Sequence, residues 1–293
     1  RGYMTLLKDA ITQEVLMCPN CDISLNYHKH DNTLKCHQCD YQTKQIPKGS
    51  DNQPLKVVGS GVGTQRLQEY LEHRFPNAKV GRMDRDTTTR KHAHEKILTA
   101  FRNHEYDILV GTQMIAKGLD IPNVTLVGIL NIDTALGHED FRSVEDTFNL
   151  ILQASGRSGR GEKQGEVIVQ TFNVDHYAIQ YAVHNQYKSF FNQEMQYRKM
   201  AQYPPYTYLI SIVFSDEKES DAYRKSQDFL KHFNDENIKV LGPSFILRLR
   251  GFHRVRIILK GKNLDEMLRQ VHSAYDKIDK GGIRIDVNPM TLM

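Results

Sequence analysis

The chain has 293 residues, 39% of them hydrophobic and 25% charged, with a formal net charge of +4 at pH 7. This composition is typical of an ordinary globular protein of two or three domains. No apolar run approaches the roughly 18 residues of a membrane-spanning helix, and no secretory leader is visible, so we expect a cytoplasmic protein without a membrane partner.

The cysteines come first along the chain, within residues 1–54. They form two Cys-x-x-Cys pairs, and each such pair supplies two thiolate ligands to a tetrahedral zinc ion. Two disulfides or four unrelated thiols are the alternatives, and disulfides are disfavoured in a reducing cytoplasm. We therefore predict a cysteine-rich zinc-binding region with one structural zinc ion. The predicted ligands are Cys18, Cys21, Cys36 and Cys39.

Residues 55–175 alternate short apolar runs with helical patterns. We expect strands at 55–58, 80–83, 108–110, 124–130 and 167–171, with helices at 64–74, 90–103, 112–116 and 144–154. This alternation predicts an α/β domain with a parallel, doubly wound sheet. Ligands of such sheets bind at the carboxyl ends of the strands.

Loops with suitable chemistry follow two of these strands. The first carries Gly61, Gly63 and Thr64 and is typical of a phosphate-binding turn at a helix N-terminus. It matches neither the dinucleotide-binding fingerprint nor a Walker A loop. The second begins Gly-Thr112 and ends with Asp120, and its amides and hydroxyl suit a nucleic-acid phosphate.

The strongest single motif spans residues 153–160 and reads QASGRSGR. Arg157 and Arg160 lie three residues apart among glycines, which allow a close backbone approach. Arginine keeps its charge and can bind phosphate oxygens in a bidentate manner, as an arginine finger does during phosphoryl transfer. A generic basic loop is the alternative interpretation.

The rest of the chain predicts a helical linker over 176–205 and a small α+β domain over 206–293. The linker pattern stops at Pro204-Pro205, and the domain follows in the order strand, helix, hairpin, helix, strand. Between Glu236 and Asp265 the sequence has seven Lys or Arg residues and no acid.

Period-two alternation in the predicted hairpin places its arginines on one face of both strands. Like charges side by side destabilise a sheet, so a polyanion is the natural partner, although a solvated cationic face is the alternative. We predict contacts with DNA phosphates from Arg248, Arg250, Arg254 and Arg256.

Several motifs in a fixed order resemble a known family. The segments GVGTQR, RMDRDTT, GTQMIAKG, DFR and QASGRSGR resemble the carboxyl-terminal motor lobe of the helicase superfamily that includes the DEAD/DEAH and RecG-like enzymes. Within it, the chain is similar along its whole length to the replication-restart DNA helicases. The resemblance implies a RecA-like lobe at 55–175 with an N-terminal zinc-binding insertion and a DNA-binding C-terminal domain.

The resemblance also implies a function. These helicases use ATP and Mg²⁺ to move 3′ to 5′ on DNA, recognise stalled forks and single strands, and promote primosome assembly. Their implied partners are single-strand-binding protein, primosome proteins and helicase loaders, and we expect a monomer. By this resemblance Arg157 and Arg160 face ATP, and further residues of its ATP side are Gly118, Asp120, Gln153 and Gly156. The residues implied to follow the DNA backbone are Gly61, Gly63, Thr64, Thr112 and Gln113.

Two features depart from the family pattern. The sequence has no GxxxxGK[ST] loop and no acidic box on a strand, so we expect ATP and Mg²⁺ to be held by residues preceding Arg1 and this chain alone to be inactive as an ATPase. The family's insertion has eight cysteines and two zinc ions, whereas the outer pairs are absent here. Their places fall near Asp9, Thr12, Gly49 and Asn52.

Two other interpretations stay open. A non-enzymatic DNA-structure-binding protein would explain the missing cysteines, but it would have little use for the arginine motif. An RNA helicase lobe would share the motor motifs without explaining the zinc region and the terminal domain together.

Overall fold

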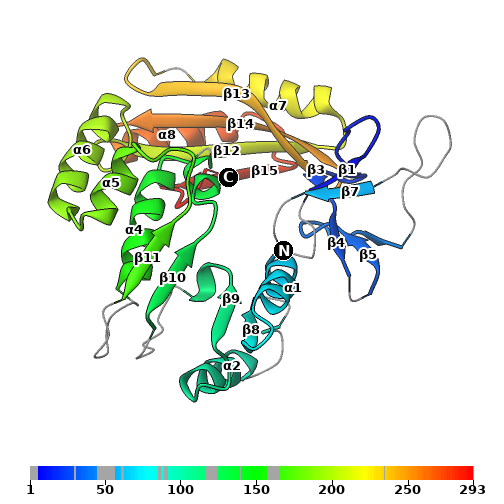
Figure 1. The fold of residues 1–293 in the computed structure, drawn as a ribbon. Helices are drawn as coiled ribbons and strands as arrows, with labels where there is room; N and C mark the ends of the chain where they lie inside the picture. Colours follow the sequence, from blue (N-terminus) through cyan, green and yellow to red (C-terminus); the bar gives the residue numbers. More distant parts are fainter. Residues whose placement is uncertain are drawn as a thin grey trace. The chain divides into compact units, whose positions relative to one another are not determined.

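The computed structural model describes residues 6–29, 31–44, 57–60, 63–84, 87–88, 92–115, 124–138, 140–156, 165–233 and 235–292 (Figure 1). By its contacts the chain divides into two units, residues 1–127 with 153–166 and residues 128–152 with 167–293. Within the described ranges, no helix is long and apolar enough to cross a bilayer.

The cysteine-rich part of the first unit is built from short antiparallel strands. The hairpin β2–β3 (Met17–Cys18 and Cys21–Ser24) precedes the sheet β4-β5-β6 (Asn26–His28, Thr33–Lys35 and Gln42–Thr43). Strand β1 (Leu6–Asp9) pairs antiparallel with β7 (Val57–Ser60). The sequence placed the strand near 55–58 in the parallel sheet, and its pairing with β1 is a departure from that expectation.

The other elements of the first unit follow the predicted alternation. They are α1 (Thr64–Arg74), β8 (Val80–Met83), α2 (Ala93–Arg102), β9 (Ile108–Gly111) and the short 3₁₀ helix η1 (Gln113–Ile115). Strands β8 and β9 are parallel, which confirms this part of the prediction. Gly111 ends β9, and a Cβ atom there would lie 2.2 Å from the carbonyl oxygen of Met83, so only glycine fits this register.

The second unit begins with a helical body beside a strand pair. Its elements are β10 (Leu126–Ile129), α3 (Asp133–Leu136), α4 (Ser143–Ser155), β11 (Glu166–Val169), α5 (Tyr177–Val183) and α6 (Tyr187–Met200). Strand β10 pairs with β11. The core of this body contains the rings of Phe148 and Phe190, which stack with centroids 3.8 Å apart.

The carboxyl-terminal part confirms the predicted order of elements. It consists of β12 (Tyr208–Asp216), α7 (Glu219–His232), β13 (Lys239–Leu249), β14 (Phe252–Gly261), α8 (Leu264–Tyr275) and β15 (Ile283–Val287). The antiparallel sheet has the order β13-β14-β12-β15, which is the split βαβ arrangement (Figure 1).

Both helices of this domain cover the same face of the sheet. Alternate strand residues such as Ile212, Phe214 and Ile257 are fully buried against side chains of α7 and α8, including Phe229 and Met267. Because successive strand residues point to opposite faces, the residues between them belong to a second face that no helix of this domain covers. We call this second surface the open face.

One end of the open face is covered by the segment that follows α6. Lys260 is only 5% exposed, and its Nζ donates a hydrogen bond of 3.0 Å to the carbonyl oxygen of Ala201. The same ammonium lies 3.3 Å from the ring centroid of Tyr203. Burial, and then the neighbouring charge of Lys239, lower the pKa of Lys260. The linker is thereby fixed to the sheet at this end.

Candidate zinc centre and nucleic-acid interface

The four cysteines converge in the structure. The sulfur atoms of Cys18, Cys21, Cys36 and Cys39 all lie within 4.8 Å of one another, and the Sγ atoms of Cys18 and Cys39 are 3.6 Å apart. A tetrahedral site with Zn–S bonds of about 2.3 Å requires sulfur atoms about 3.8 Å apart. The cluster therefore fits a zinc ion, and its four protein ligands would leave no position for a substrate.

The local backbone holds the cysteine thiols in positions suited to binding a metal. The amide of Asn20 donates to the Cys18 sulfur at 3.4 Å, and Cys18 pairs with Cys21 across the β2–β3 turn. Burial raises the pKa of the Cys18 thiol to about 12. Burial acts in the same direction on Cys39, but hydrogen bonds from the Tyr41 backbone and from the other thiols outweigh it and lower that pKa to about 7. Charged thiolates so close together need a cation to balance them.

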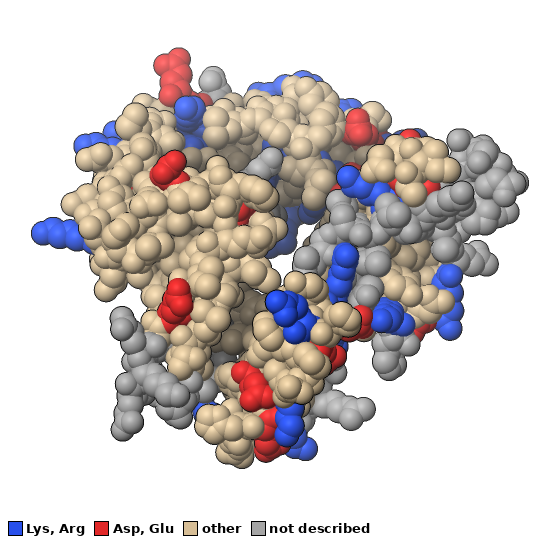
Figure 2. Space-filling view, in the orientation of Figure 1, with Lys and Arg blue, Asp and Glu red and all other residues tan. Residues whose placement is uncertain are grey.

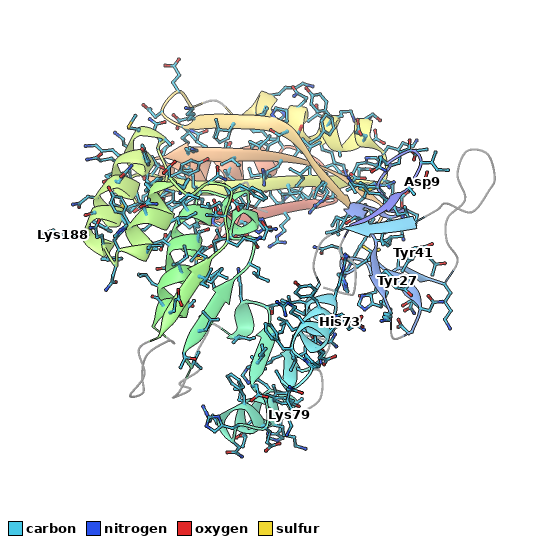
Figure 3. The ribbon with its side chains drawn as sticks, viewed as in Figure 1. Asp9, Tyr27, Tyr41, His73, Lys79 and Lys188 are labelled. Atoms are coloured by element: carbon cyan, nitrogen blue, oxygen red, sulfur yellow. The ribbon has the colours of Figure 1, made fainter. Side chains whose placement is uncertain are left out.

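The turn at residues 9–13 is closed without a cysteine. Asp9 lies at the end of β1, and Tyr27 on β4 and Tyr41, just before β6, belong to the same cysteine-rich part (Figure 3). Its carboxylate accepts a 3.0 Å hydrogen bond from the Thr12 amide, and its carbonyl accepts another from the Gln13 amide. Among the described residues, the four cysteines are the only cluster found that could hold a metal. The predicted counterpart positions Gly49 and Asn52 lie outside the described residues.

Four of the predicted ATP-side residues lie outside the described residues, namely Gly118, Asp120, Arg157 and Arg160. Gly61, which was predicted to follow the DNA backbone, also lies outside them. Gln153 is exposed near the end of α4, and Gly156 follows that helix. Thr112 and Gln113 are exposed directly after β9, at the carboxyl end of a parallel strand as expected.

Thr64 has a structural partner that the sequence did not assign. Its hydroxyl donates to a carboxylate oxygen of Asp84 at 2.6 Å, and the other oxygen accepts from the Thr87 amide. Burial opposes ionisation of Asp84, but these hydrogen bonds and the nearby Arg82 lower its pKa. Gly63, which precedes Thr64, is buried at the start of α1. Asp84 thus joins the loop after β8 to the start of α1.

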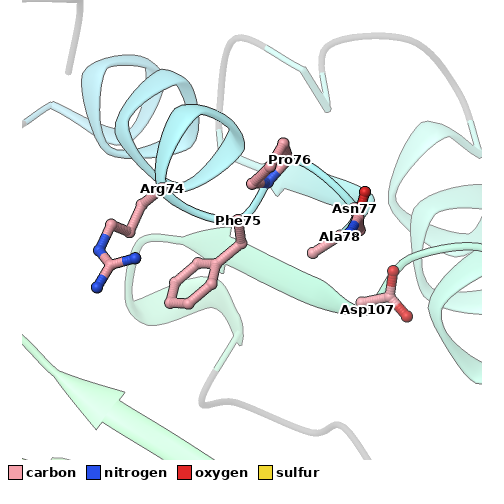
Figure 4. Close-up of a pocket in the computed structure, with 6 residues that line it drawn as sticks. All are labelled: Arg74, Phe75, Pro76, Asn77, Ala78 and Asp107. Atoms are coloured by element: carbon pink, nitrogen blue, oxygen red, sulfur yellow. The ribbon is translucent and has the colours of Figure 1, made fainter.

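A surface hollow of about 390 Å³ lies elsewhere in the first unit. It is lined by the end of α1 and the residue before β9: Arg74, Phe75, Pro76, Asn77, Ala78 and Asp107 (Figure 4). The Asp107 carboxylate already accepts a 2.8 Å hydrogen bond from the Lys79 amide. None of the predicted site residues lines this hollow, so it is not a candidate for the motor chemistry.

A buried ion-pair cluster supports α4, the helix that leads into the arginine motif. Arg198 of α6 donates to Glu145 of α4 and to Glu194 of its own helix, both at 2.7 Å, and only 12% of its side chain is exposed. Burial opposes the charge on Arg198, but the two carboxylates outweigh it and raise its pKa. Tyr177 donates to the second oxygen of Glu194 at 2.6 Å. No local sequence pattern predicts this cluster, because residues 145 and 198 are far apart in the sequence and meet only in the folded chain.

The start of α4 is held from the carboxyl end of the chain as well. The Asp140 carboxylate accepts hydrogen bonds of 2.7 Å from the Thr291 hydroxyl and from the Leu292 amide. The ring of Phe141 stacks on Tyr203 with centroids 5.3 Å apart. The first half of α4 and the carboxyl-terminal domain are therefore parts of one packed unit.

The basic hairpin differs from its prediction in two places. Arg254 and Arg256 alternate with buried Val255 and Ile257, so they point to the open face as expected. Arg250, however, has φ of 53° and forms the two-residue turn with Gly251, at φ of 87°. The prediction that all four arginines share one face is therefore wrong for Arg250, because such a tight turn needs positive φ at both central residues.

Arg248 lies in a register shift between residues 246 and 249 of β13, where the alternation is interrupted. Across the visible face of the chain, acidic and basic side chains are interspersed (Figure 2). Net charge alone therefore does not mark a binding surface. The local row of arginines in the hairpin is what indicates one.

Comparison with known proteins gives two consecutive family matches. Residues 19–162 match the helicase conserved C-terminal domain, and residues 199–290 match the primosomal protein N C-terminal domain. The whole chain is 42% identical to replication restart protein PriA of Bacillus subtilis and covers 38% of that protein. It is 35% identical to the PriA of Borreliella burgdorferi and covers 45% of it.

The chain belongs to the PriA family. It corresponds to a carboxyl-terminal portion of the family's longer members and spans less than half the length of these two relatives. The family match confirms the resemblance drawn from the motifs. It also confirms an α/β helicase C-terminal domain, whereas the roles of individual residues stay predictions.

We expect the purified chain to bind one zinc ion. The Cys21→Ser variant should lose the metal, because the cluster needs all four thiolates to surround it. The Asp9→Ala variant should keep it, because Asp9 closes a turn instead of contributing to the cysteine cluster. Metal analysis by mass spectrometry measures the ratio. A value near two for the original chain, or metal loss in Asp9→Ala, would contradict this assignment.

Removal of the Arg198 charge should destabilise the second unit strongly. The Arg198→Met variant leaves the buried carboxylate of Glu194 and the partly exposed carboxylate of Glu145 without their partner. Loss of one partner from a buried ion pair costs about 3–5 kcal/mol. Arg269→Met is the matched control, because Arg269 pairs with Glu266 on the surface with 73% of its side chain exposed. Urea unfolding followed by circular dichroism compares them, and equal midpoints for both variants would refute the role of the cluster.

Proposed function

We propose that this chain is the carboxyl-terminal part of an ATP-dependent 3′–5′ DNA helicase that recognises stalled replication forks and restarts replication. The tandem of a helicase C-terminal domain and a primosomal protein C-terminal domain carries this proposal. The end-to-end similarity to replication restart proteins supports it.

On the nucleotide side, Arg157 and Arg160 would contact the phosphates of ATP and Mg²⁺ held mainly by another lobe of the whole protein. Gly118, Asp120, Gln153 and Gly156 would complete that side of the motor. A guanidinium suits this task because it keeps its charge and can stabilise charge on the transferred phosphoryl group. The anchoring of α4 through Glu145 and Asp140 supports this proposal, because the arginine motif begins in the last turn of α4.

On the DNA side, Gly61, Gly63, Thr64, Thr112 and Gln113 would follow the DNA backbone through the motor lobe. The hairpin arginines would bind phosphates from the carboxyl-terminal domain. The zinc ion would stabilise the cysteine-rich region, which is too small to fold on an apolar core of its own.

The partners of the whole protein form part of the same proposal. They are forked and single-stranded DNA, single-strand-binding protein, primosome proteins and a helicase loader, which would meet a monomeric motor in the cytoplasm. Each follows from the family resemblance, and none requires a membrane.

Salt dependence of DNA binding tests the DNA side. Replacing Arg248, Arg250, Arg254 and Arg256 with Gln should weaken binding of this chain to DNA. The log–log salt slope should fall by about one unit for each lost phosphate contact. Replacing Arg224 and Lys231 on α7, with side chains 69% and 70% exposed, is the control and should leave the slope unchanged. Unchanged affinity in the hairpin variant would refute the assignment.

A second expectation concerns ATP. The chain by itself should show no DNA-stimulated ATP hydrolysis, because its sequence offers neither a Walker A loop nor a strand-borne carboxylate for Mg²⁺. A phosphate-release assay with and without single-stranded DNA measures the rate. DNA-stimulated turnover that disappears in the Arg160→Ala variant would contradict the proposal that ATP and Mg²⁺ are held mainly by another lobe of the whole protein.

A further inference from the structure

A row of side chains on the open face combines an aromatic ring with two guanidinium groups. Phe252, Arg254 and Arg256 occupy every second position of β14, and the intervening His253 and Val255 point to the helix-covered face. The strand therefore carries its aromatic and basic groups side by side on one surface.

The neighbours of this row make a surface without acidic side chains in register. Across the sheet, Arg256 lies between Val213 and Ser244, and Arg254 lies between Ser215 and Ile246. These four neighbours in register are small or apolar side chains. The nearest acid in register is on β15, where Asp286 pairs with Arg284 at 3.6 Å.

The exposure of Phe252 is not explained by packing. The residue is 44% exposed, and no aromatic ring in the described part of the chain stacks on its side chain. Phe245 of the same hairpin is also exposed, but it points to the other face and stacks on Tyr223 of α7 with centroids 5.7 Å apart. Phe252 is thus the aromatic side chain that the hairpin presents beside its arginines.

Arg254 is held in a defined position beside this ring. Its Nε donates a 2.8 Å hydrogen bond to the carbonyl oxygen of Leu247, in the irregular part of β13. A fixed planar guanidinium can bind a phosphate or stack on a base. The row therefore offers both kinds of contact that a strand of unpaired nucleotides needs.

We propose that the open face binds single-stranded DNA, with one base stacked on Phe252 and the adjoining phosphates held by Arg254 and Arg256. This inference rests on the proposed DNA-binding function and names the form of DNA that the site takes. Positive charge beside an exposed ring is the combination by which proteins hold single strands without reading their sequence. Duplex DNA offers only its phosphates here, because its bases are stacked on one another.

The test compares the effects of the Phe252 ring, of the arginine charges and of the form of the DNA on binding by this chain. Binding of a fluorescent single-stranded oligonucleotide, and of its duplex, is measured by anisotropy over a range of salt. We expect Phe252→Ala to weaken single-strand binding by about tenfold with an unchanged salt slope, and Phe252→Tyr to bind as the original chain does. Duplex binding should not change. Phe245→Ala, on the opposite face, should not change either affinity.

A base analogue reports the stacking itself. A 2-aminopurine placed in the oligonucleotide should lose fluorescence on binding to the original chain and to Arg254→Gln, but not to Phe252→Ala. Circular dichroism confirms that each variant keeps its fold.

The outcomes separate this inference from the wider proposal. Single-strand affinity that is unchanged in Phe252→Ala overturns the stacking site, and equal losses for single-stranded and duplex DNA overturn its selectivity. In both cases an arginine-dependent salt slope would leave the proposed function standing. Absence of DNA binding by the original chain would overturn both.

Discussion

The carboxyl-terminal domain is governed by one constraint, which is that its two helices cover only one face of a four-stranded sheet. The covered face takes the apolar side chains, and Phe214, Ile257 and Phe229 are fully buried there. The other face is not covered by these helices, and its two ends differ in what lies on them. At one end the segment after α6 covers it through Lys260 and Tyr203. The remaining part carries arginines, whose mutual repulsion a bound polyanion would relieve.

Two kinds of interaction other than apolar packing stabilise particular parts of the chain. In the cysteine-rich region, four sulfur atoms lie within 4.8 Å of one another and could hold a metal ion. A hydrogen bond from the Thr12 amide to Asp9 closes a neighbouring turn. Around α4, the ion pairs of Arg198 with Glu145 and Glu194 join α4 to α6. A metal or a buried charge fixes geometry well only if every partner is present, so both kinds of interaction depend on complete sets of ligands.

Local patterns predicted much of this structure. The helix at 64–74 and the strand at 80–83 were predicted with the bounds observed, because periodicity and turn residues are local signals. The paired cysteines predicted their own cluster for the same reason. The pairing of β1 with β7 and the contact of Arg198 with Glu145 could not be predicted, because residues far apart in sequence meet only after the chain folds. The turn at Arg250 was missed because arginine rarely adopts positive φ.

We propose that nucleic acid occupies the open face and not the helix-covered side of the same hairpin. Hydroxyl-radical footprinting of this chain, with and without a single-stranded oligonucleotide, tests it directly, because Phe252 and Phe245 are exposed on opposite faces. Bound DNA should slow the oxidation of Phe252 and leave the oxidation of Phe245 and Tyr223 unchanged. Protection of Phe245 and Tyr223 without protection of Phe252 would contradict it.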